Sequence, residues 1–365
     1  MRARFNYATG KIVCLVVLIA GCSLLFAAPA RACMVCIPFP EETVVDVLLG
    51  ADVVVLAREN PDKPFSYLAA EVIKGNLNNP EIDLFVTSSM RRRLNSNPQR
   101  YALLALQKKS SEASGSGSTG NWRPLGYANE RYEKIARDVV TQSARWRDRQ
   151  HAGERAAYFM PYLADADRNI HEIAYLEIGK APYDTIREAD GFVSPDQISN
   201  FLSDPLYLEW QRLYILLLGF EAAPEEANLI RERMADLARY DTDFNLSAWA
   251  TALIEVDGTD AIDWLQRHYL ENPGRNSTIV LEAVKAMSVH GSRNPAPLRN
   301  RIAEAYAALV QAHPDLSGWV ARDLTAWQDW RFADALEEVR KTRKVTDGPS
   351  VYAIDYYVGR SRSSY

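Results

Sequence analysis

The sequence has little of the chemistry that builds most catalytic and metal centres. Its 365 residues include four cysteines and five histidines, and none of the histidines stands at metal-ligand spacing from a second histidine, a cysteine or a motif such as H-E-x-x-H. It also lacks a nucleophile elbow, a P-loop and the glycine fingerprint of dinucleotide-binding folds. We therefore expect no catalytic residues, no metal ligands and no cofactor, and we predict that the protein is not an enzyme.

An excess of basic residues is also missing. The chain carries 42 lysines and arginines against 47 acidic residues, a formal net charge of −5. Removal of residues 1–32, which hold four basic residues and no acidic ones, would shift this charge to −9. Because general nucleic-acid binding needs a basic surface, we expect no nucleic-acid partner.

The start of the chain has the order of a secretory signal peptide over residues 1–32. A basic beginning is followed by an apolar run over residues 12–28 and by the small-residue pair Ala30 and Ala32. Cleavage after Ala32 would leave no membrane span and give a secreted or periplasmic protein. A retained anchor is the alternative, although the apolar run is short for crossing a bilayer.

A second cleavage site competes with the first. Residues 19–22 (Ile-Ala-Gly-Cys) resemble a bacterial lipobox, in which Cys22 would be acylated and would anchor the protein to a membrane. The segment over residues 23–28 stays apolar, where a lipoprotein usually turns polar. We therefore favour the free protein over the lipoprotein.

Cleavage after Ala32 would leave only two cysteines, Cys33 and Cys36. In an oxidising compartment they would form a local disulfide or an exchangeable redox pair. A redox motif would open a helix, whereas Pro38 and Pro40 favour extended chain, so a structural disulfide is the favoured interpretation. Two thiols make only half a zinc site, and the C-x-x-C-H haem motif lacks its histidine.

Residues 33–128 have the pattern of a small β-rich unit. A short helix is predicted over residues 41–49, and a loop over residues 110–121 has a flexible Ser/Gly-rich composition. Apolar runs predict five strands, at residues 51–57, 65–73, 82–86, 101–106 and 122–125. Several short strands with one early helix suggest a small barrel of the OB type.

Three consecutive arginines, Arg91, Arg92 and Arg93, follow a pair of serines. They are a candidate site for an anion or a phosphorylated group. A solvated turn beside a strand end is the favoured interpretation.

Residues 153–345 change to paired amphipathic helices, after a connecting helix over residues 129–152. Apolar landmarks in the first helix of each pair recur at intervals of 34 to 40 residues, at Leu217, Leu253, Met287 and Trp327. This is the period of a HEAT-like α-solenoid, and an irregular helical bundle is the alternative. For the tail over residues 346–365, an added edge strand, packing on the last helix and a disordered terminus all remain open.

One helical pair resembles a HEAT unit in detail. Residues 159–165 and 170–179 would be its two helices, with an aspartate capping the turn between them. His171, on the second helix, is predicted to be a surface or packing residue. The tryptophans are predicted to be core, or binding anchors if they line a concave surface: Trp249, Trp264, Trp319, Trp327 and Trp330.

Two motifs in the β-rich unit carry a family resemblance. A cysteine directly after the signal peptide, then ADVVVLARE at residues 51–59 and EVIKG at residues 71–75, are similar to the netrin-like domain of tissue inhibitors of metalloproteinases. They are more similar to uncharacterised bacterial secreted proteins that begin this way and continue into helical repeats. The resemblance implies an OB-type domain at the start of the mature chain.

The same resemblance implies a role for Cys33. In the inhibitors, the N-terminal cysteine chelates the zinc of the target enzyme through its amino group and carbonyl. This chain departs from the family, because its cysteines are spaced Cys33-x-x-Cys36 rather than Cys-x-Cys and no cysteine follows in the barrel to hold them.

The sequence thus predicts an α+β protein of several domains, with a small OB-like β-barrel followed by an α-solenoid of HEAT-like hairpins. We expect a secreted or periplasmic binding or scaffold protein whose helical-repeat surface binds another envelope protein. The alternatives are an envelope thiol-redox or metal-binding protein centred on Cys33 and Cys36, and a metalloproteinase inhibitor acting through Cys33.

Overall fold

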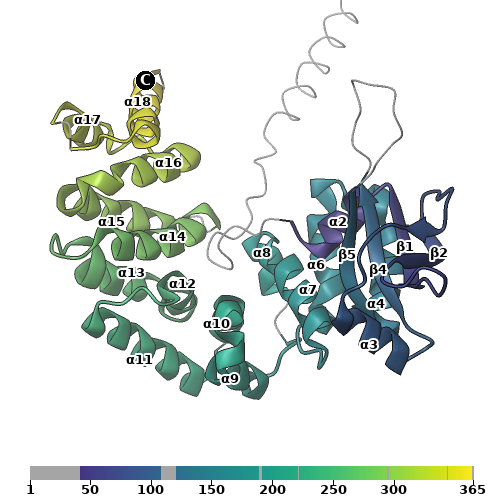
Figure 1. Cartoon of the computed structure of the whole chain (residues 1–365). Helices are drawn as coiled ribbons and strands as arrows, with labels where there is room; N and C mark the ends of the chain where they lie inside the picture. Colours follow the sequence, from purple (N-terminus) through teal and green to yellow (C-terminus); the bar gives the residue numbers. More distant parts are fainter. Residues whose placement is uncertain are drawn as a thin grey trace, which may run out of the picture.

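The computed structural model describes residues 42–107, 121–188, 191–220, 222–293, 296–342 and 344–363. The predictions for the leader over residues 1–32, for Cys22, Cys33 and Cys36, and for the loop over residues 110–120 fall outside these residues. Within them the fold is α+β, as the sequence predicts, with one antiparallel sheet and many helices (Figure 1).

Five strands form the sheet in the order β3-β2-β1-β4-β5. Their bounds are β1 Val53–Glu59, β2 Tyr67–Lys74, β3 Glu81–Ile82, β4 Tyr101–Gln107 and β5 Asn121–Ala128. Irregularities in the β1–β2 and β4–β5 registers help to curl the sheet into a half-barrel. Strand β1 lies at its centre, because its apolar, β-branched residues are suited to burial on both faces.

The two faces of β1 belong to two different cores. Val54 and Leu56 join the large core that includes helices α2 (Val44–Gly50) and α4 (Glu130–Thr141). Val53 and Val55, on the other face, join a smaller core that includes Leu94 of α3 (Ser88–Ser96). Alternation of side chains along the strand thus ties the sheet to helices on both sides.

The predicted third strand is shorter than expected. Its pairing with β2 covers only Glu81 and Ile82. The backbone N–H of Leu84 donates a hydrogen bond to the carbonyl oxygen of Ile82 (2.9 Å), which turns the chain away from the ladder. At the opposite edge, strand β5 contains Pro124, which has no backbone N–H to offer a further strand.

The predicted turn at Arg91–Arg93 is wrong. These residues lie in helix α3 (Ser88–Ser96). The hydroxyl of Thr87 accepts a hydrogen bond from the backbone N–H of Met90 (3.2 Å) and caps the helix, and arginine is a good helix former.

Helices that follow the sheet connect it to the helical array. They include α5 Ser143–Trp146, α6 Ala152–Phe159, α7 Arg168–Gly179, α8 Tyr183–Arg187 and α9 Pro195–Ser203. Short 3₁₀ segments lie at Arg149–His151, Met160–Tyr162, Pro205–Trp210 and Pro314–Leu316. The connecting helix predicted over residues 129–152 is therefore broken, because α4 ends at Thr141.

The rest of the chain forms two rows of helices (Figure 1). In the first row, each helix packs on the next: α10 Gln211–Gly219, α12 Leu246–Asp257, α14 Ser277–Arg293, α16 Ser317–Trp327 and α18 Gly348–Ser363. The second row holds α11 Pro224–Tyr240, α13 Thr259–Leu265, α15 Leu298–Ala312 and α17 Ala333–Lys341, with a π turn at Gln266–Leu270. The predicted pairing of helices is present, and Leu217, Leu253 and Met287 are all buried in the first row. No helix in the described ranges has the length and apolarity needed to span a membrane.

Of the alternatives left open for the C-terminal tail, packing on the last helices is the one found. The tail forms α18, which packs on α16 and α17. Its residues Ile354 and Tyr357 are fully buried, and the Tyr357 hydroxyl donates a hydrogen bond to the carbonyl oxygen of Asp329 (2.6 Å).

A charged cluster joins α2, beside the sheet, to α6 and α7. The side chain of Glu177 is only 1% exposed, and it accepts hydrogen bonds from the Thr43 hydroxyl (2.5 Å) and from Arg155. Arg155 also pairs with Asp46 (2.7 Å), which bonds Lys180 as well. Burial raises the pKa of Asp46, but hydrogen bonds from Lys180, the Thr43 backbone and Arg155 outweigh it and lower that pKa well below its ordinary value.

Replacement of Arg155 by methionine would leave the buried Glu177 carboxylate without its cation. We expect the free energy of unfolding, measured by urea denaturation at pH 7, to fall by about 3–5 kcal/mol. The double variant R155M/E177Q should recover part of this loss, because it removes the unpaired charge. A loss below about 1 kcal/mol in the single variant would contradict the conclusion that Arg155 stabilises the buried Glu177 carboxylate.

The first row depends on a close approach of α10 to α12. A Cβ atom added at Gly219 would lie 2.8 Å from both the Cα and the Cβ of Ala252, closer than carbon atoms pack. Only glycine at this position lets the two helices lie at their present distance.

We therefore expect Gly219→Ala to push α10 away from α12 and to lower the free energy of unfolding by about 1–3 kcal/mol. Gly359→Ala is the matched control, because a Cβ there meets no atom within 4 Å. The control should be neutral or stabilising by up to ~1 kcal/mol, since alanine favours helix. Equal denaturation curves for the two variants would show that α10 and α12 can move apart without a loss of stability.

Candidate functional site

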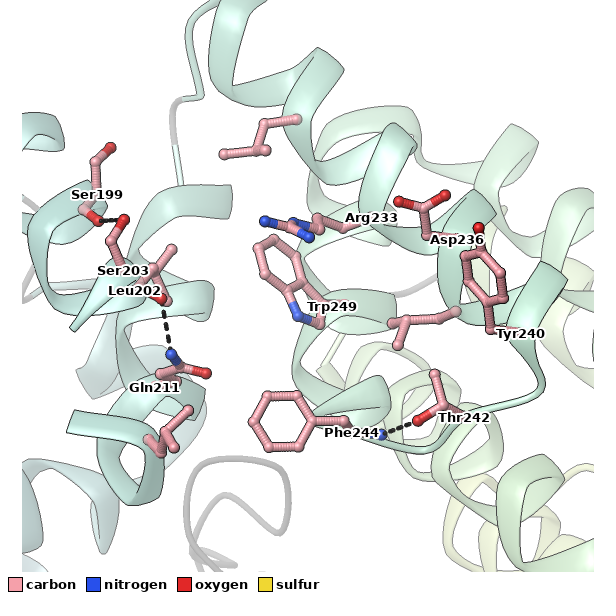
Figure 2. A pocket seen from close by; sticks show the side chains of 13 residues that line it. Ser199, Leu202, Ser203, Gln211, Arg233, Asp236, Tyr240, Thr242, Phe244 and Trp249 are labelled. Atoms are coloured by element: carbon pink, nitrogen blue, oxygen red, sulfur yellow. Dashed lines mark hydrogen bonds between the residues drawn. The ribbon is translucent and has the colours of Figure 1, made fainter. Parts of the chain in front are cut away.

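A cleft of about 610 Å³ opens between two neighbouring parts of the helical array (Figure 2). One wall comes from α9, the 3₁₀ segment Pro205–Trp210 and the start of α10. The other comes from α11, the turn after it and Trp249 of α12. We call it the α9–α11 cleft.

The first wall is fixed by local hydrogen bonds. Helix α9 begins with a capping box between Ser194 and Gln197. At its end, the side-chain amide of Gln211 donates a hydrogen bond to the carbonyl oxygen of Leu202 (2.8 Å), which ties α9 to α10. Leu202 and the neutral side chains of Ser203 and Gln211 therefore face the cleft in a fixed position.

The second wall is a stripe along α11. Leu229, Arg233, Leu237 and Tyr240 recur at helical spacing and lie on the side that faces the cleft. The helix ends at Asp241, whose backbone is left-handed (φ 51°), and the following turn directs the chain into α12. The end of one helix and the beginning of the next thus share this wall.

Asn245 links α10 to the segment just before α12. Its side-chain oxygen accepts a hydrogen bond from Arg212 Nε (3.2 Å), and its amide donates one to Gln211 Oε1 (3.2 Å). Both partners belong to α10, while Asn245 immediately precedes α12. The separation of the walls is therefore held by side-chain bonds as well as by helix packing.

Large apolar side chains protrude at the edges of the cleft. Leu208 on the first wall is 47% exposed, and on the second wall Phe244 is 52% and Tyr240 69% exposed. Trp249, between them and deeper, is only 7% exposed. Large apolar side chains from both walls are thus left in water around one hollow.

Arg233 is the cation of this cleft. Figure 2 shows its guanidinium extending from α11 towards the gap, above Trp249, whereas the carboxylate of Asp236 lies farther along the helix beside Tyr240. Among the residues that the structure describes, no carboxylate forms an ion pair with Arg233. The cleft thus combines an apolar surface with a cation, Arg233, that has no ion-pair partner among the described residues, and with one carboxylate, Asp236, farther along the same wall (Figure 2).

Behind the first wall lies a buried histidine. The Tyr214 hydroxyl donates its only hydrogen to the carbonyl oxygen of Leu163 (3.0 Å), so in its bond with His171 it must accept from Nε2–H. The other ring nitrogen, Nδ1, is buried without a partner among the described residues. His171 is therefore neutral, with its proton on Nε2.

Aromatic rings surround His171. The rings of Phe201, Tyr207 and Trp210 have their centroids 5.1 to 5.3 Å from it. A proton on Nδ1 would have no acceptor there, and burial lowers the pKa of His171 to about 4. Since these rings come from α9 and the 3₁₀ segment, the wall of the cleft rests on a neutral histidine, which is the packing role predicted for it.

Arg91, Arg92 and Arg93, the predicted site residues that the structure describes, do not line this cleft. Cys33 and Cys36 are outside the described residues. Arg91 is half-buried, with its Nε 2.8 Å from a carboxylate oxygen of Glu59 and its guanidinium 4.7 Å from the ring centre of Phe65. It is therefore already neutralised by a neighbour.

Arg92 and Arg93 are both exposed. Arg93 lies over the ring of Tyr127 (5.9 Å) and lines a separate hollow of about 560 Å³ together with Arg168 of α7. The helical geometry of α3 thus separates Arg91 from Arg93, and the structure does not gather the three arginines into one site.

Of the five tryptophans named from the sequence, Trp249 is buried, and the other four are partly buried against the same core. Trp249 lines the α9–α11 cleft, and Trp327 and Trp330 line another hollow on the array. Trp264 stacks on His268, with ring centroids 4.1 Å apart. In the described ranges, no three His, Cys, Asp or Glu side chains come together as a metal site.

Comparison of this chain with protein-family models, with curated proteins and with solved structures gives no match. Assignment of a function therefore depends on the geometry of the molecule itself.

The sequence alone did not predict the α9–α11 cleft. The one available signal was large apolar residues in short polar connections, such as Leu208 after Pro205 and Phe244 after Asp243.

The buried histidine makes stability depend on pH. In the folded state His171 takes up a second ring proton only near pH 4. In the unfolded state it does so near the ordinary pKa of 6.5. As the pH falls through this window, we expect His171 to cost up to about 3 kcal/mol of the free energy of unfolding. His290, whose pKa burial also lowers to about 4, adds a similar loss.

His171→Phe should flatten the pH dependence of the urea midpoint between pH 7 and pH 4. The half-buried His151 supplies the control, and His151→Gln should keep the slope of the parent protein. An unchanged slope in the His171 variant would show that its proton does not distinguish the folded from the unfolded state.

Proposed function

We propose that this protein is a secreted or periplasmic, non-enzymatic binding protein that holds another protein in the α9–α11 cleft. The observation that carries the proposal is the exposed apolar rim: Leu208 and Phe244 stand in water on opposite walls of one hollow. Their exposure is unfavourable in the free protein, and a partner that covers both would remove it.

The shape of the surface favours a protein over a small molecule. A compact ligand inside 610 Å³ would leave Leu208, Phe244 and Tyr240 exposed at the edges. A polypeptide segment can fill the hollow and also cover the rim. Trp249 at the floor and Phe244 at the edge match the usual anchors of protein interfaces, where aromatic residues carry much of the binding energy.

We further propose that the array is a HEAT-like solenoid and that the sheet is an OB-type, netrin-like domain. The two rows of helices, with each helix of the first row packed on the next, support the first proposal. The curled antiparallel half-barrel with α2 and α4 on one face supports the second. The alternatives centred on Cys33 and Cys36 stay predictions.

Site-specific photocrosslinking tests the binding role. With p-benzoylphenylalanine in place of Phe244, irradiation in an envelope extract should give discrete adducts. The same residue in place of Phe85, which is 65% exposed on the β-rich unit, is the matched control. Leu208→Asp should weaken the Phe244-specific adduct roughly tenfold or more, as expected when the loss of an apolar interface contact costs about 2 kcal/mol.

Adducts that form equally from both positions, or that survive Leu208→Asp unchanged, would contradict a binding site at the cleft. Circular dichroism of the Leu208 variant controls for folding, and because that side chain is about half exposed we expect an unchanged spectrum.

A further inference from the structure

We propose that the α9–α11 cleft selects a partner segment in which a carboxylate stands beside a large apolar side chain. The carboxylate would pair with Arg233, and the apolar side chain would lie between Phe244 and the floor at Trp249. This inference rests on the proposed function and adds the chemistry of the partner.

The placement of Arg233 is the first argument. It lies between Leu229 and Leu237 on the stripe of α11 that faces the cleft, one helical turn from each. A cation within an apolar stripe becomes partly dehydrated when a partner covers the stripe. That cost is offset only if the partner supplies an anion.

The second argument is the contrast with neighbouring arginines. Arg231, two residues away, forms an ion pair with Asp257 (2.6 Å), and Arg275 near the end of α11 pairs with Asp241. Both are therefore satisfied within the chain. Among the described residues, Arg233 has no such carboxylate, and Figure 2 shows it directed at the gap.

The opposite wall can accept only a limited range of partners. Its polar side chains are neutral, and two of them already make internal bonds: Ser203 donates to the carbonyl oxygen of Ser199 (2.8 Å), and Gln211 donates to that of Leu202 (2.8 Å). This wall therefore has no charged group that could pair with a charge on the partner. The partner's carboxylate would lie at Arg233 on the α11 side, away from Asp236, which lies farther along that wall (Figure 2).

Three fluorescent hexapeptides test the inference by anisotropy with the full chain. They share a Phe-Leu pair and differ in one neighbouring residue, which is Glu, Gln or Lys. We expect the Glu peptide to bind roughly tenfold more tightly than the Gln peptide, the worth of one charge-assisted hydrogen bond, and the Lys peptide to bind most weakly.

Variants separate the charge from the apolar contact. Arg233→Gln should make the Glu and Gln peptides equal, and Arg233→Glu should reverse the preference in favour of the Lys peptide. Arg239→Gln is the control, because Arg239 is exposed on the same helix, lies over the Tyr240 ring (5.9 Å) and does not line the cleft. It should keep the parent order of affinities.

Phe244→Ala should weaken the binding of all three peptides by the same factor. This result tests whether the cleft binds a peptide at all. If Phe244→Ala does so but the Arg233 variants keep the parent order, the carboxylate inference is overturned and the proposed function stands. If no peptide binds the parent protein, or Phe244→Ala changes nothing, both fail. Sedimentation equilibrium that shows a dimer dispersed by Phe244→Ala would assign the cleft to a second copy and also overturn the inference.

Discussion

The buried carboxylate of Glu177 is the constraint on which the joint between the two parts of the molecule depends. It is held by Arg155, which also reaches Asp46 on α2 beside the sheet. A carboxylate so deeply buried is tolerated only with a cation and a hydroxyl in contact, so α2, α6 and α7 must meet at one point. After α7 the chain continues through α8 and α9 into the array. The position of the first wall of the cleft, which includes α9, therefore depends on this joint.

A second constraint acts inside the array. The approach of α10 to α12 at Gly219 and the bonds of Asn245 to α10 set how far apart the two walls stand. Neither contact uses the exposed apolar side chains of the cleft, although Gln211, which bonds Asn245, also lines it. The exposed apolar groups are therefore held by helix packing and polar bonds that do not depend on those groups themselves.

Much of the fold could be predicted from hydrophobic patterning. Continuous apolar runs located β1 and β4, and helical spacing located the pairs from α10 to α17. The errors have physical causes. The strand at residues 82–86 ended early because the chain turns after Ile82, and the arginine run became a helix because Thr87 caps it.

The cleft could not be predicted in the same way. Leu237 and Trp249 look like ordinary core positions in the sequence, and only the crossing of helices distant in the chain turns them into a floor and a wall. The free charge of Arg233 depends equally on which carboxylates come near it in three dimensions.

The open sheet has one further consequence. A half-barrel leaves two edges, and an unprotected edge is a template on which other chains can add strands and aggregate. Here the two-residue strand β3 covers only the start of β2 at one edge, and the other edge strand, β5, carries Pro124. Because proline has no backbone N–H, a strand added along β5 would lack a hydrogen-bond donor at Pro124, and the ladder would be interrupted there.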